Sequence, residues 1–570
     1  MRILFLSHAF NSLTQRLFVE LQALGHEVSV EFDINDKVAI EAVELYQPEL
    51  IIAPFLKRAI PESIWSQYEC LIVHPGICGD RGPSALDWAI LNKEEHWGIT
   101  VLQANAEMDA GKIRAFSGFD MREASKASLY HNEVTEAAVA AVKHAVDYFQ
   151  SGFEITPAVN KGILRPLMQQ SDRCIDWQND ATEMVLRKIR SADGFPGVRD
   201  TLFEREFFLY DAQYEKLLTG KPGEIIARCG VAICRATVDG AVWIGHLREK
   251  ENNHPFKLPA TQLLAAELTE LAEVVFDKAA ENKLDKATGY CDIWYEEEDE
   301  IGYLHFSFYN GAMGVLQCER LLQAYIDACQ RNTKIIVLMG GPEYWSNGMH
   351  LNLIEAAQSA ADESWRNIQA IDDLALAIIN THSHLTVAAL QGNAGAGGVF
   401  LARSCDQVWA REGVILNPHY KDMGNLYGSE YWTYLLPRYT GKENALRITQ
   451  ARLPMGTNEA LTLGLIDQFF ANDVAGFVGT VKQYAADLAN SSDYAGQLQQ
   501  KYKQRITDEA KKPLQQYRDE ELERMHMNFY GFDPSYHVAR YNFVYKVPKS
   551  RTPLTIAQHR QTGNSQRRIA

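Results

Sequence analysis

Short apolar runs alternate with helical segments twice in this 570-residue chain, once in each half. In the first series, RILFLSHA is followed by the helical SLTQRLFVELQALGH and then by EVSVEFD, and the alternation continues to about residue 150. A second series begins near residue 288. Because parallel strands are joined by helical crossovers, each series predicts an open, largely parallel β-sheet. Ligands of such sheets bind at the carboxyl ends of the strands.

The stretch between the two series has a different pattern. GEIIARCGVAICRATVDGAVWIGHLRE contains short strand-like runs separated by Gly, which is typical of a small barrel. The stretch that follows has helical spacing, with acidic and basic residues four apart. We expect the last twenty residues of the chain to be disordered. The predicted α/β fold therefore has five parts: an open parallel sheet (1–155), a barrel-like domain (156–265), a helical linker (266–287), a second α/β domain (288–485) and a helical extension with a tail (486–570).

Composition limits the partners of the chain. Its net charge of −17 argues against nucleic acid and against anionic membranes, since both select basic surfaces. No apolar run approaches the length of about 18 residues that spans a membrane. The first residues are interpreted as a strand and not as a signal peptide. Nine cysteines without a CxxC pair indicate reduced thiols in the cytoplasm, and neither a disulfide framework nor a zinc site. We expect a cytoplasmic protein that acts on small molecules and holds no metal.

A histidine and an aspartate stand where open sheets place their functional residues. His74 directly follows a predicted strand in VHPGICGDRGPSALDWAI, and Asp109 lies in a loop after another strand in GITVLQANAEMDAGKI. An imidazole with a carboxylate can relay a proton and stabilise a charged oxygen. An isolated His and Asp can equally be structural. The GxGxxG motif is absent after the first strand, so a dinucleotide is not expected.

Residues 1–260 resemble the 10-formyltetrahydrofolate-dependent formyltransferases and hydrolases, whose motifs read N-x-H-P-S-L-L-P-x-x-R-G and D-x-G. The matching positions are His74, Pro75, Arg81, Gly82, Asp109 and Gly111. The resemblance implies that His74 and Asp109 catalyse formyl release. It also implies a folate site that includes Pro54, Phe55, Leu56, Ile72 and Arg81.

One position departs from the family motif. The family asparagine two residues before the histidine is Ile72 in this chain. The amide that would hold the formyl oxygen is therefore missing, which weakens the case for transfer to water or an amine. In the branch of the family with Ile at this position, the formyl group passes toward a phosphopantetheine thiol. Coenzyme A carries the same arm, so the resemblance implies a thiol acceptor.

Two glycine-rich loops follow apolar strands in the second half of the chain: GGPEYWSNGMHLN (340–352) and ALQGNAGAGGVFLARSCD (389–406). No GK[ST] follows either loop, so a P-loop is not expected. Glycine lets backbone N–H groups point into a cavity, where they can hold a thioester oxygen that gains charge. Glycine that serves close packing is the alternative for either loop alone.

Residues 288–480 resemble the enoyl-CoA hydratase/isomerase (crotonase) family, and the stretch that ends in GLID belongs to the same resemblance. This likeness implies the crotonase fold and a coenzyme A thioester as ligand. It implies that the amides of Met349 and Gly397 stabilise the thioester oxygen. The residues implied around the thioester are Ser346, Gly348, Leu351 and Gly398.

The acidic residues of the hydratases are missing. Hydratases carry one Glu after the second glycine loop and another about twenty residues later, whereas this chain has Phe400 and Tyr420 at those positions. Water addition needs a carboxylate pair, so hydratase activity is not expected. Glu430 lies in the same loop as Tyr420, among aromatic residues that could raise its pKa. We expect Tyr420 and Glu430 to be the proton carriers of this domain. A Glu at the start of a surface helix is the alternative for Glu430.

Over its full length, the chain resembles the hydrogenase maturation factors of the HypX (HoxX) family. The resemblance implies formyl transfer from 10-formyltetrahydrofolate to coenzyme A, followed by decarbonylation of formyl-CoA to carbon monoxide and coenzyme A. The carbon monoxide would be used in the assembly of [NiFe]-hydrogenase, and other hydrogenase maturation proteins are the expected recipients of the gas. Two alternatives remain open: release of formate by hydrolysis of formyl-CoA, and a non-catalytic scaffold that binds folate and coenzyme A.

Overall fold

The computed structural model describes residues 1–152, 163–251, 254–274, 289–471 and 473–561. These residues divide into two compact units, which are described separately. The first unit comprises Met1–Glu251, Pro259–Val274 and the chain from Pro548, and the second comprises Asn252–Leu258 and Val275–Val547. Within the described ranges, no helix is both long enough and apolar enough to cross a membrane.

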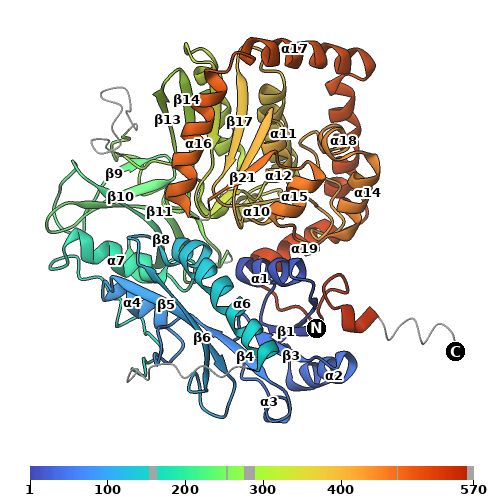
Figure 1. Ribbon diagram of the computed structural model, residues 1–570. Coiled ribbons are helices and arrows are strands. Elements are labelled where there is room, and N and C mark those ends of the chain that lie inside the picture. Colours follow the sequence, from blue (N-terminus) through green and yellow to red (C-terminus); the bar gives the residue numbers. More distant parts are fainter. Residues whose placement is uncertain (153–162, 252–253, 275–288, 472, 562–570) are drawn as a thin grey trace. The chain divides into compact units, whose positions relative to one another are not determined.

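The first unit begins with a sheet in the order β2-β1-β3-β4-β5-β6 (Figure 1). Its strands are β1 (Arg2–Ser7), β2 (Glu27–Phe32), β3 (Leu50–Ala53), β4 (Cys70–His74), β5 (His96–Gln103) and β6 (Ile113–Asp120). The pairs among the first four strands are parallel, and β5 and β6 continue the sheet in antiparallel pairs. The predicted open, largely parallel sheet is confirmed.

Helices cover this sheet. They are α1 (Ser12–Ala23), α2 (Asp36–Tyr46), α3 (Glu62–Trp65), α4 (Ala85–Leu91), α5 (Lys126–Leu129), the π-helical turn η1 (Tyr130–Val134) and α6 (Thr135–Ser151). The side chains of Asn11 and Asn35 accept hydrogen bonds from the first turns of α1 and α2, so both helices begin at a capping residue. Helix α6 packs across β5 and β6 (Figure 1).

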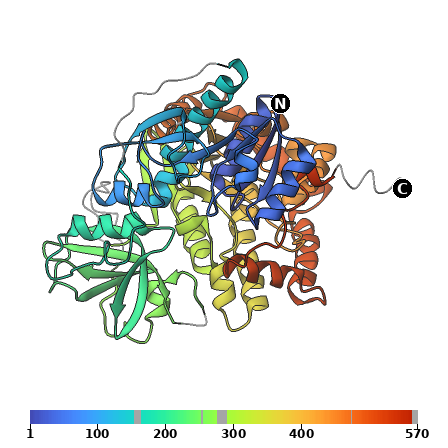
Figure 2. The ribbon, with the colours of Figure 1, turned by 90° about the horizontal axis from the view of Figure 1, so that it is seen from below.

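The middle part of the chain forms an antiparallel sheet in the order β7-β8-β11-β10-β9 (Figure 2). Its strands are β7 (Val198–Leu202), β8 (Arg205–Glu215), β9 (Ile225–Cys229), β10 (Ala232–Ala236) and β11 (Ala241–Glu249). Helix α7 (Thr182–Ala192) packs on β8 and β11, and its apolar face joins the core between them. A small antiparallel β-sheet is therefore present in the region for which a small barrel was predicted.

The helical linker predicted for residues 266–287 is not found in its described part. After β12 (Leu258–Pro259), helix α8 ends at Leu263, and the chain continues in turns. Glu273 then forms a bridge with Arg228 of β9, which adds this segment to the first unit. Residues 266–274 have the charge spacing of a helix, but the bridge between Glu273 and Arg228 at the edge of β9 holds them in a non-helical conformation. Residues 275–287 lie outside the described residues.

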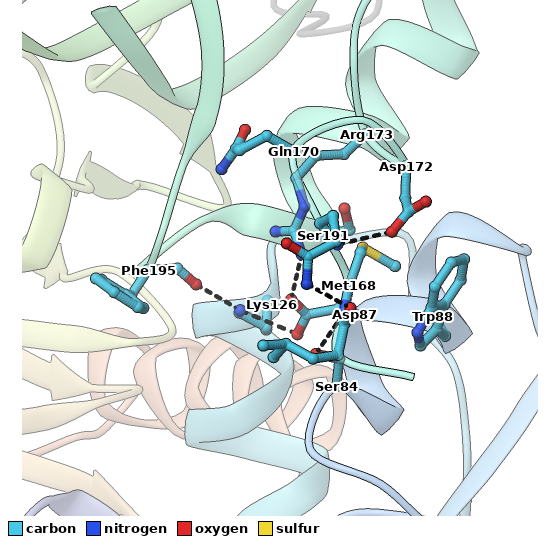
Figure 3. A network of polar contacts seen from close by, with 12 residues as sticks. Ser84, Asp87, Trp88, Lys126, Met168, Gln170, Asp172, Arg173, Ser191 and Phe195 are labelled. Carbon is cyan, nitrogen blue, oxygen red and sulfur yellow. Dashed lines mark hydrogen bonds and ion pairs between the residues drawn. The ribbon is translucent and has the colours of Figure 1, made fainter. Parts of the chain in front are cut away.

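Buried charges connect the middle segment to the first sheet (Figure 3). Asp87 of α4 accepts hydrogen bonds from Lys126 Nζ (3.0 Å) and from the buried Arg173 Nη2 (3.0 Å). Lys126 also donates to the carbonyl of Phe195 (2.6 Å). Burial lowers the pKa of Lys126, and Asp87 opposes this by favouring the charged ammonium. The network fixes the segment before α7 against the helix that follows the His74 loop.

The end of the described chain packs against β2. Phe32 donates its N–H to Thr552 Oγ1 (2.8 Å), and Val30 donates to the carbonyl of Ile556 (3.0 Å). The fully buried Glu31 accepts hydrogen bonds from His559 Nε2 (2.9 Å) and Arg560 Nε (2.7 Å). The expectation of disorder is therefore wrong for residues 551–561, while 562–570 lie outside the described residues.

The second unit contains a sheet in the order β13-β14-β15-β17-β19-β21 and a smaller parallel sheet, β16-β18-β20. The strands are β13 (Ile293–Glu298), β14 (Ile301–Phe306), β15 (Ile335–Met339), β16 (Tyr344–Ser346), β17 (Leu385–Leu390), β18 (Asn393–Gly395), β19 (Gln407–Arg411), β20 (Leu416–Asn417) and β21 (Gln468–Phe470). In the larger sheet, only the β13–β14 pair is antiparallel among the described pairs. The smaller sheet brings together the two glycine loops and the stretch that leads to Tyr420.

The helices of this unit are α9 (Val315–Cys329), α10 (Leu351–Ala356), α11 (Ala360–Ile379), α12 (Gly397–Arg403), α13 (Trp432–Thr440), α14 (Lys442–Ala451), α15 (Thr457–Leu463), α16 (Val474–Ala489), α17 (Tyr494–Lys511), α18 (Leu514–Tyr530) and α19 (Ser535–Val544), with a short 3-10 turn η3 (Tyr309–Gly311). Between residue 486 and Val544 the described chain is largely helical, as predicted. Helix α18 packs against α11 and α13, so this extension contributes to the core of the second unit.

Candidate active sites

The first candidate site lies at the carboxyl ends of β3 and β4. His74 is the last residue of β4 and is buried. Ala53 pairs with Ile72, so Pro54, which follows β3, begins beside the strand that carries His74. The carbonyl of Phe55 accepts the N–H of His8 (2.7 Å), which ties this loop to the end of β1. The predicted folate segment and the predicted catalytic histidine therefore lie on adjacent strand ends.

Asp109 faces His74 from the loop between β5 and β6. His74 Nδ1 lies 3.5 Å from Asp109 Oδ2, and the Gly82 N–H donates to the same oxygen (3.1 Å). Asp109 has a positive φ of 52°, a conformation that costs energy for a residue with a side chain. A Cβ on Gly111 would lie 1.7 Å from the carbonyl oxygen of Gln103, so glycine is required there. The matched motifs thus hold the carboxylate toward the imidazole.

A second carboxylate, Asp80, lies on the other side of the imidazole and was missed from the sequence. Its Oδ2 is 3.6 Å from His74 Nε2, and its Oδ1 accepts a hydrogen bond from Arg165 Nε (2.6 Å). A signal was present, because Asp80 directly precedes the matched Arg81 in the sequence CGDRG. The side chain of Arg81 itself is partly exposed and lies 3.5 Å from Glu107.

The two glycine loops meet in the second unit. A Cβ built on Gly348 would lie 3.6 Å from the amide nitrogen of Gly397, so the predicted pair of amide donors belongs to adjacent backbones. Trp345 Nε1 donates to the carbonyl of Gly398 (3.0 Å), which joins the loops. The Ser346 hydroxyl accepts the Gly348 N–H (3.0 Å) and is fully buried, so it shapes the first loop. Met349 follows at the bend, and Leu351 begins α10.

Tyr420 and Glu430 are brought together as predicted. The Tyr420 hydroxyl lies 2.5 Å from Glu430 Oε2 and 2.9 Å from the carbonyl of Ser429. Both side chains are buried. The other carboxyl oxygen of Glu430 faces the second glycine loop, since a Cβ on Gly397 would lie 2.0 Å from Oε1. The predicted proton carrier and the predicted oxyanion donor are therefore neighbours, and a surface position for Glu430 is excluded.

Phe400 forms an apolar wall beside Tyr420. Its ring is fully buried and stacks on the Tyr420 ring, with centroids 5.5 Å apart and an interplanar angle of 19°. On the other side, a Cβ on Gly428 would lie 2.1 Å from the Tyr420 ring, and Gly428 has a φ of +92°. The phenol is held between these two residues, so its hydroxyl is directed at Glu430 with little freedom.

The electrostatics assign different protonation states to the pair. Burial raises the pKa of Glu430 to about 8. Burial and the nearby Glu430 carboxylate raise the pKa of Tyr420 well above its usual range. Tyr420 therefore stays protonated and acts as a hydrogen-bond donor. Glu430 titrates near neutral pH, where a group can both accept and donate a proton.

Two further buried acids surround this pair, and nothing in the local sequence pattern indicated them. Asp372 is on α11 and Glu521 is on α18, far from Glu430 in the sequence. Asp372 accepts the Glu430 N–H (2.8 Å), and Glu521 accepts the Tyr431 N–H (3.0 Å). Residues of a helical segment outside the glycine loops thus complete the candidate site.

Family models match three parts of the chain. The model described as "Formyl transferase" matches residues 24–146, and the one described as "Formyl transferase, C-terminal domain" matches 167–259. The model described as "Enoyl-CoA hydratase/isomerase" matches residues 316–531, which include α18.

Full-length relatives join the same parts in one chain. The chain is 56% identical over 564 residues to the "Hydrogenase maturation factor HoxX" of Bradyrhizobium diazoefficiens, covering 98% of this chain and 97% of the relative. The structure superposes on HypX from Aquifex aeolicus in complex with tetrahydrofolic acid with a TM-score of 0.95 and 50% identity, covering 98% of this chain and 99% of the other. A methionyl-tRNA formyltransferase of Citrifermentans bemidjiense is 24% identical over 235 residues, covering 40% of this chain and 71% of the relative.

Proposed function

The chain belongs to the HypX/HoxX family of hydrogenase maturation factors, and on this basis we propose that it makes carbon monoxide in two steps. The first half transfers the formyl group of 10-formyltetrahydrofolate to the thiol of coenzyme A. The second half splits formyl-CoA into carbon monoxide and coenzyme A. In this proposal the carbon monoxide is passed, in the cytoplasm, to proteins that assemble the [NiFe] centre of hydrogenase.

One observation carries the second step: Glu430 faces Gly397 and has Tyr420 and the apolar Phe400 as neighbours. Activation of water would need a further carboxylate in the position of Phe400. Decarbonylation instead needs a proton moved from carbon to sulfur, together with donors that hold the formyl oxygen. An apolar wall suppresses hydrolysis to formate, because water is excluded.

The proton balance needs a single carrier. In its carboxylate form, Glu430 accepts the formyl hydrogen as H⁺ while the electron pair of the C–H bond becomes the carbon lone pair of carbon monoxide. The C–S bond breaks, and its electron pair leaves on the thiolate of coenzyme A. Glu430 then returns the proton to sulfur, so the enzyme is unchanged and no oxidant is used. A pKa of about 8 suits this exchange because it is close to that of a thiol, about 8.5. Tyr420 donates a hydrogen bond throughout.

In the first half, we assign proton handling to His74 and orientation of the imidazole to Asp109, which lies 3.5 Å from its Nδ1. Pro54, Phe55 and Leu56 would line the folate. The family relationship and the tetrahydrofolic acid complex of the Aquifex aeolicus protein support this assignment. Ile72 in place of an amide supports a thiol as acceptor.

The function is tested by supplying the purified protein with 10-formyltetrahydrofolate and coenzyme A and measuring carbon monoxide and formate separately. We expect carbon monoxide as the main one-carbon product, and none without coenzyme A. Formate as the main product would support hydrolysis of formyl-CoA instead. Binding of both compounds without either product would support a scaffold.

Carbon monoxide release from supplied formyl-CoA should increase with pH. The carrier starts as a carboxylate, and with a pKa of about 8 only about a tenth of Glu430 is ionised at pH 7. The rate at saturating formyl-CoA should therefore rise through pH 7 and pH 8 and level off above about pH 9, after subtraction of spontaneous thioester hydrolysis. A rate that falls over this range would mean that Glu430 acts first as an acid.

A further inference from the structure

The turn that carries Glu430 has an unfavourable backbone. Glu430 and Tyr431 have φ angles of 60° and 57°, so two consecutive residues with side chains adopt the left-handed conformation. Such residues cost of the order of 1–3 kcal/mol each and persist only where surrounding contacts hold them. The contacts here are the Asp372 and Glu521 carboxyl groups, which accept the N–H groups of Glu430 and Tyr431.

Glu521 has the hydrogen bonds of an ionised carboxylate. Its Oε2 accepts the N–H of Tyr431 (3.0 Å), and its Oε1 accepts the N–H (2.8 Å) and the hydroxyl (2.5 Å) of Thr433. Both oxygens therefore act as acceptors of backbone donors, which an amide or a protonated acid cannot do equally well. These N–H groups belong to the start of α13, where a negative charge is favoured.

Ser429 lies between the two acids. Its Oγ is 2.8 Å from Asp372 Oδ2 and 3.3 Å from Glu521 Oε2. A hydroxyl has one hydrogen and can donate to only one carboxylate. Both contacts are separate two-centre hydrogen bonds only if one acid is protonated and donates to Ser429, which then donates to the other. Since Glu521 is the acceptor of the Tyr431 and Thr433 N–H groups, the proton belongs on Asp372 Oδ2.

We propose that Asp372 and Glu521 are positioning residues that share one proton through Ser429, with the proton on Asp372 and the charge on Glu521. This unit holds the left-handed turn and keeps Glu430 against Gly397. The inference rests on the proposed function for its catalytic consequence. The sharing of the proton itself follows from the geometry of the three side chains.

Of the other groups that face this site, Arg518 is charged, and its charge favours the ionised form of Asp372. Arg518 of α18 has its Nε 3.9 Å from Asp372 Oδ2, but its Nη1 pairs with Asp373 at 2.7 Å. Tyr420 and Cys318 of α9 are buried near Glu430, and burial raises the pKa of each well above its usual range, so both are neutral. Burial raises the pKa of both Asp372 and Glu521, which agrees with one proton held by the pair at neutral pH, and the backbone N–H groups that donate to Glu521 place that proton on Asp372.

The test compares two conservative substitutions that the proposal treats unequally. In Asp372→Asn, the amide NH₂ donates to Ser429 and the amide oxygen accepts the Glu430 N–H, as the protonated acid does. We expect carbon monoxide release from formyl-CoA at pH 7 within about threefold of wild type. In Glu521→Gln, one backbone N–H faces the amide NH₂ group in place of a carboxylate oxygen and loses its acceptor. We expect the rate of carbon monoxide release from formyl-CoA to fall roughly tenfold or more.

A matched control is available at the position next to Glu521. Glu520→Gln makes the same chemical change at an exposed residue of α18 and should not alter the rate. Asp372→Asn should leave the pH midpoint of carbon monoxide release near its wild-type value, because Asp372 is already neutral, whereas Glu521→Gln removes a negative charge near Glu430 and should move the midpoint to lower pH. A purely structural contact at Glu521 would leave the midpoint unchanged in both variants.

Infrared spectroscopy tests the shared proton without reference to catalysis. With Glu430 replaced by Gln, so that its own carboxylic acid does not contribute, we expect a buried carboxylic acid band near neutral pH that is lost on adding Asp372→Asn and kept on adding Glu521→Gln. The reverse pattern, in the spectrum or in the rates, would overturn the assignment of the proton to Asp372, and so would an equal fall in the rate of carbon monoxide release in both variants. Wild-type rates in both variants would overturn the positioning role of the two residues. If wild type released no carbon monoxide while the band behaved as expected, the proposed function alone would fail.

Discussion

Glu430→Gln should lower carbon monoxide release from supplied formyl-CoA by about 10²–10⁴-fold, the range typical for loss of one positioned proton carrier. The amide has the same shape but cannot accept the formyl proton. Glu430 is buried with a pKa raised to about 8, so at neutral pH it is mostly a neutral acid that an amide replaces without exposing a buried charge. Folding should therefore survive, and thermal unfolding is the check.

Tyr420→Phe is the companion variant. It keeps the ring against Phe400 and Gly428 and removes only the hydroxyl that contacts Glu430. A loss in the lower part of the same range is expected, because the phenol donates a hydrogen bond but does not carry the proton. Tyr427→Phe, an exposed tyrosine in the same loop, is the matched control and should behave as wild type.

Formyl transfer from 10-formyltetrahydrofolate to coenzyme A should be unchanged in both variants, with formyl-CoA or formate accumulating. If Glu430→Gln and Tyr420→Phe both released carbon monoxide from formyl-CoA at near wild-type rates, the pair would be structural and the chemistry would lie elsewhere.

His74→Ala should have the opposite pattern. Formation of formyl-CoA from 10-formyltetrahydrofolate should fall by about 10²–10⁴-fold, because the group that handles the proton at the formyl carbon is removed. Carbon monoxide release from supplied formyl-CoA should remain at the wild-type level, since the proton carrier of that step is Glu430. The measurement is a coupled assay from the folate beside a direct assay from formyl-CoA.

His74→Asn repeats this test with a side chain closer in size, because the imidazole is buried between Asp80 and Asp109. His96→Ala is the control, since His96 is exposed on β5 and pairs with the equally exposed Asp120. Loss of both activities in His74→Asn would contradict separate sites for the two steps.

Features that depend on local spacing were predictable from the sequence. The strand-helix alternation indicated the first sheet, because a buried parallel strand and an amphipathic helix each leave their own period in the chain. The two glycine loops were predictable for a similar reason, since close approach of backbones tolerates no Cβ. Tyr420 and Glu430 were identifiable because they lie in one loop, and the structure places them in contact.

Features that depend on pairing between distant segments were not predictable. Residues 266–274 have a helical charge pattern but lie in turns that end at the edge of β9. The segment 551–561 looks polar and disordered, yet it supplies the hydrogen-bond partners of the buried Glu31. In both cases, contacts with a distant segment determine the conformation of the chain more than its local propensity does.

The sequence by itself therefore determined which two domain families the chain brings together, because motif residues close in the sequence identify them. Only the tertiary structure decided the environment that sets the protonation states on which the proposed second step depends. Asp372 and Glu521 come from helices that are far from Glu430 in the chain, and they meet it because α11, α13 and α18 pack together. Burial and charge proximity, which shift a pKa, are properties of that packing and leave no periodic pattern in the sequence.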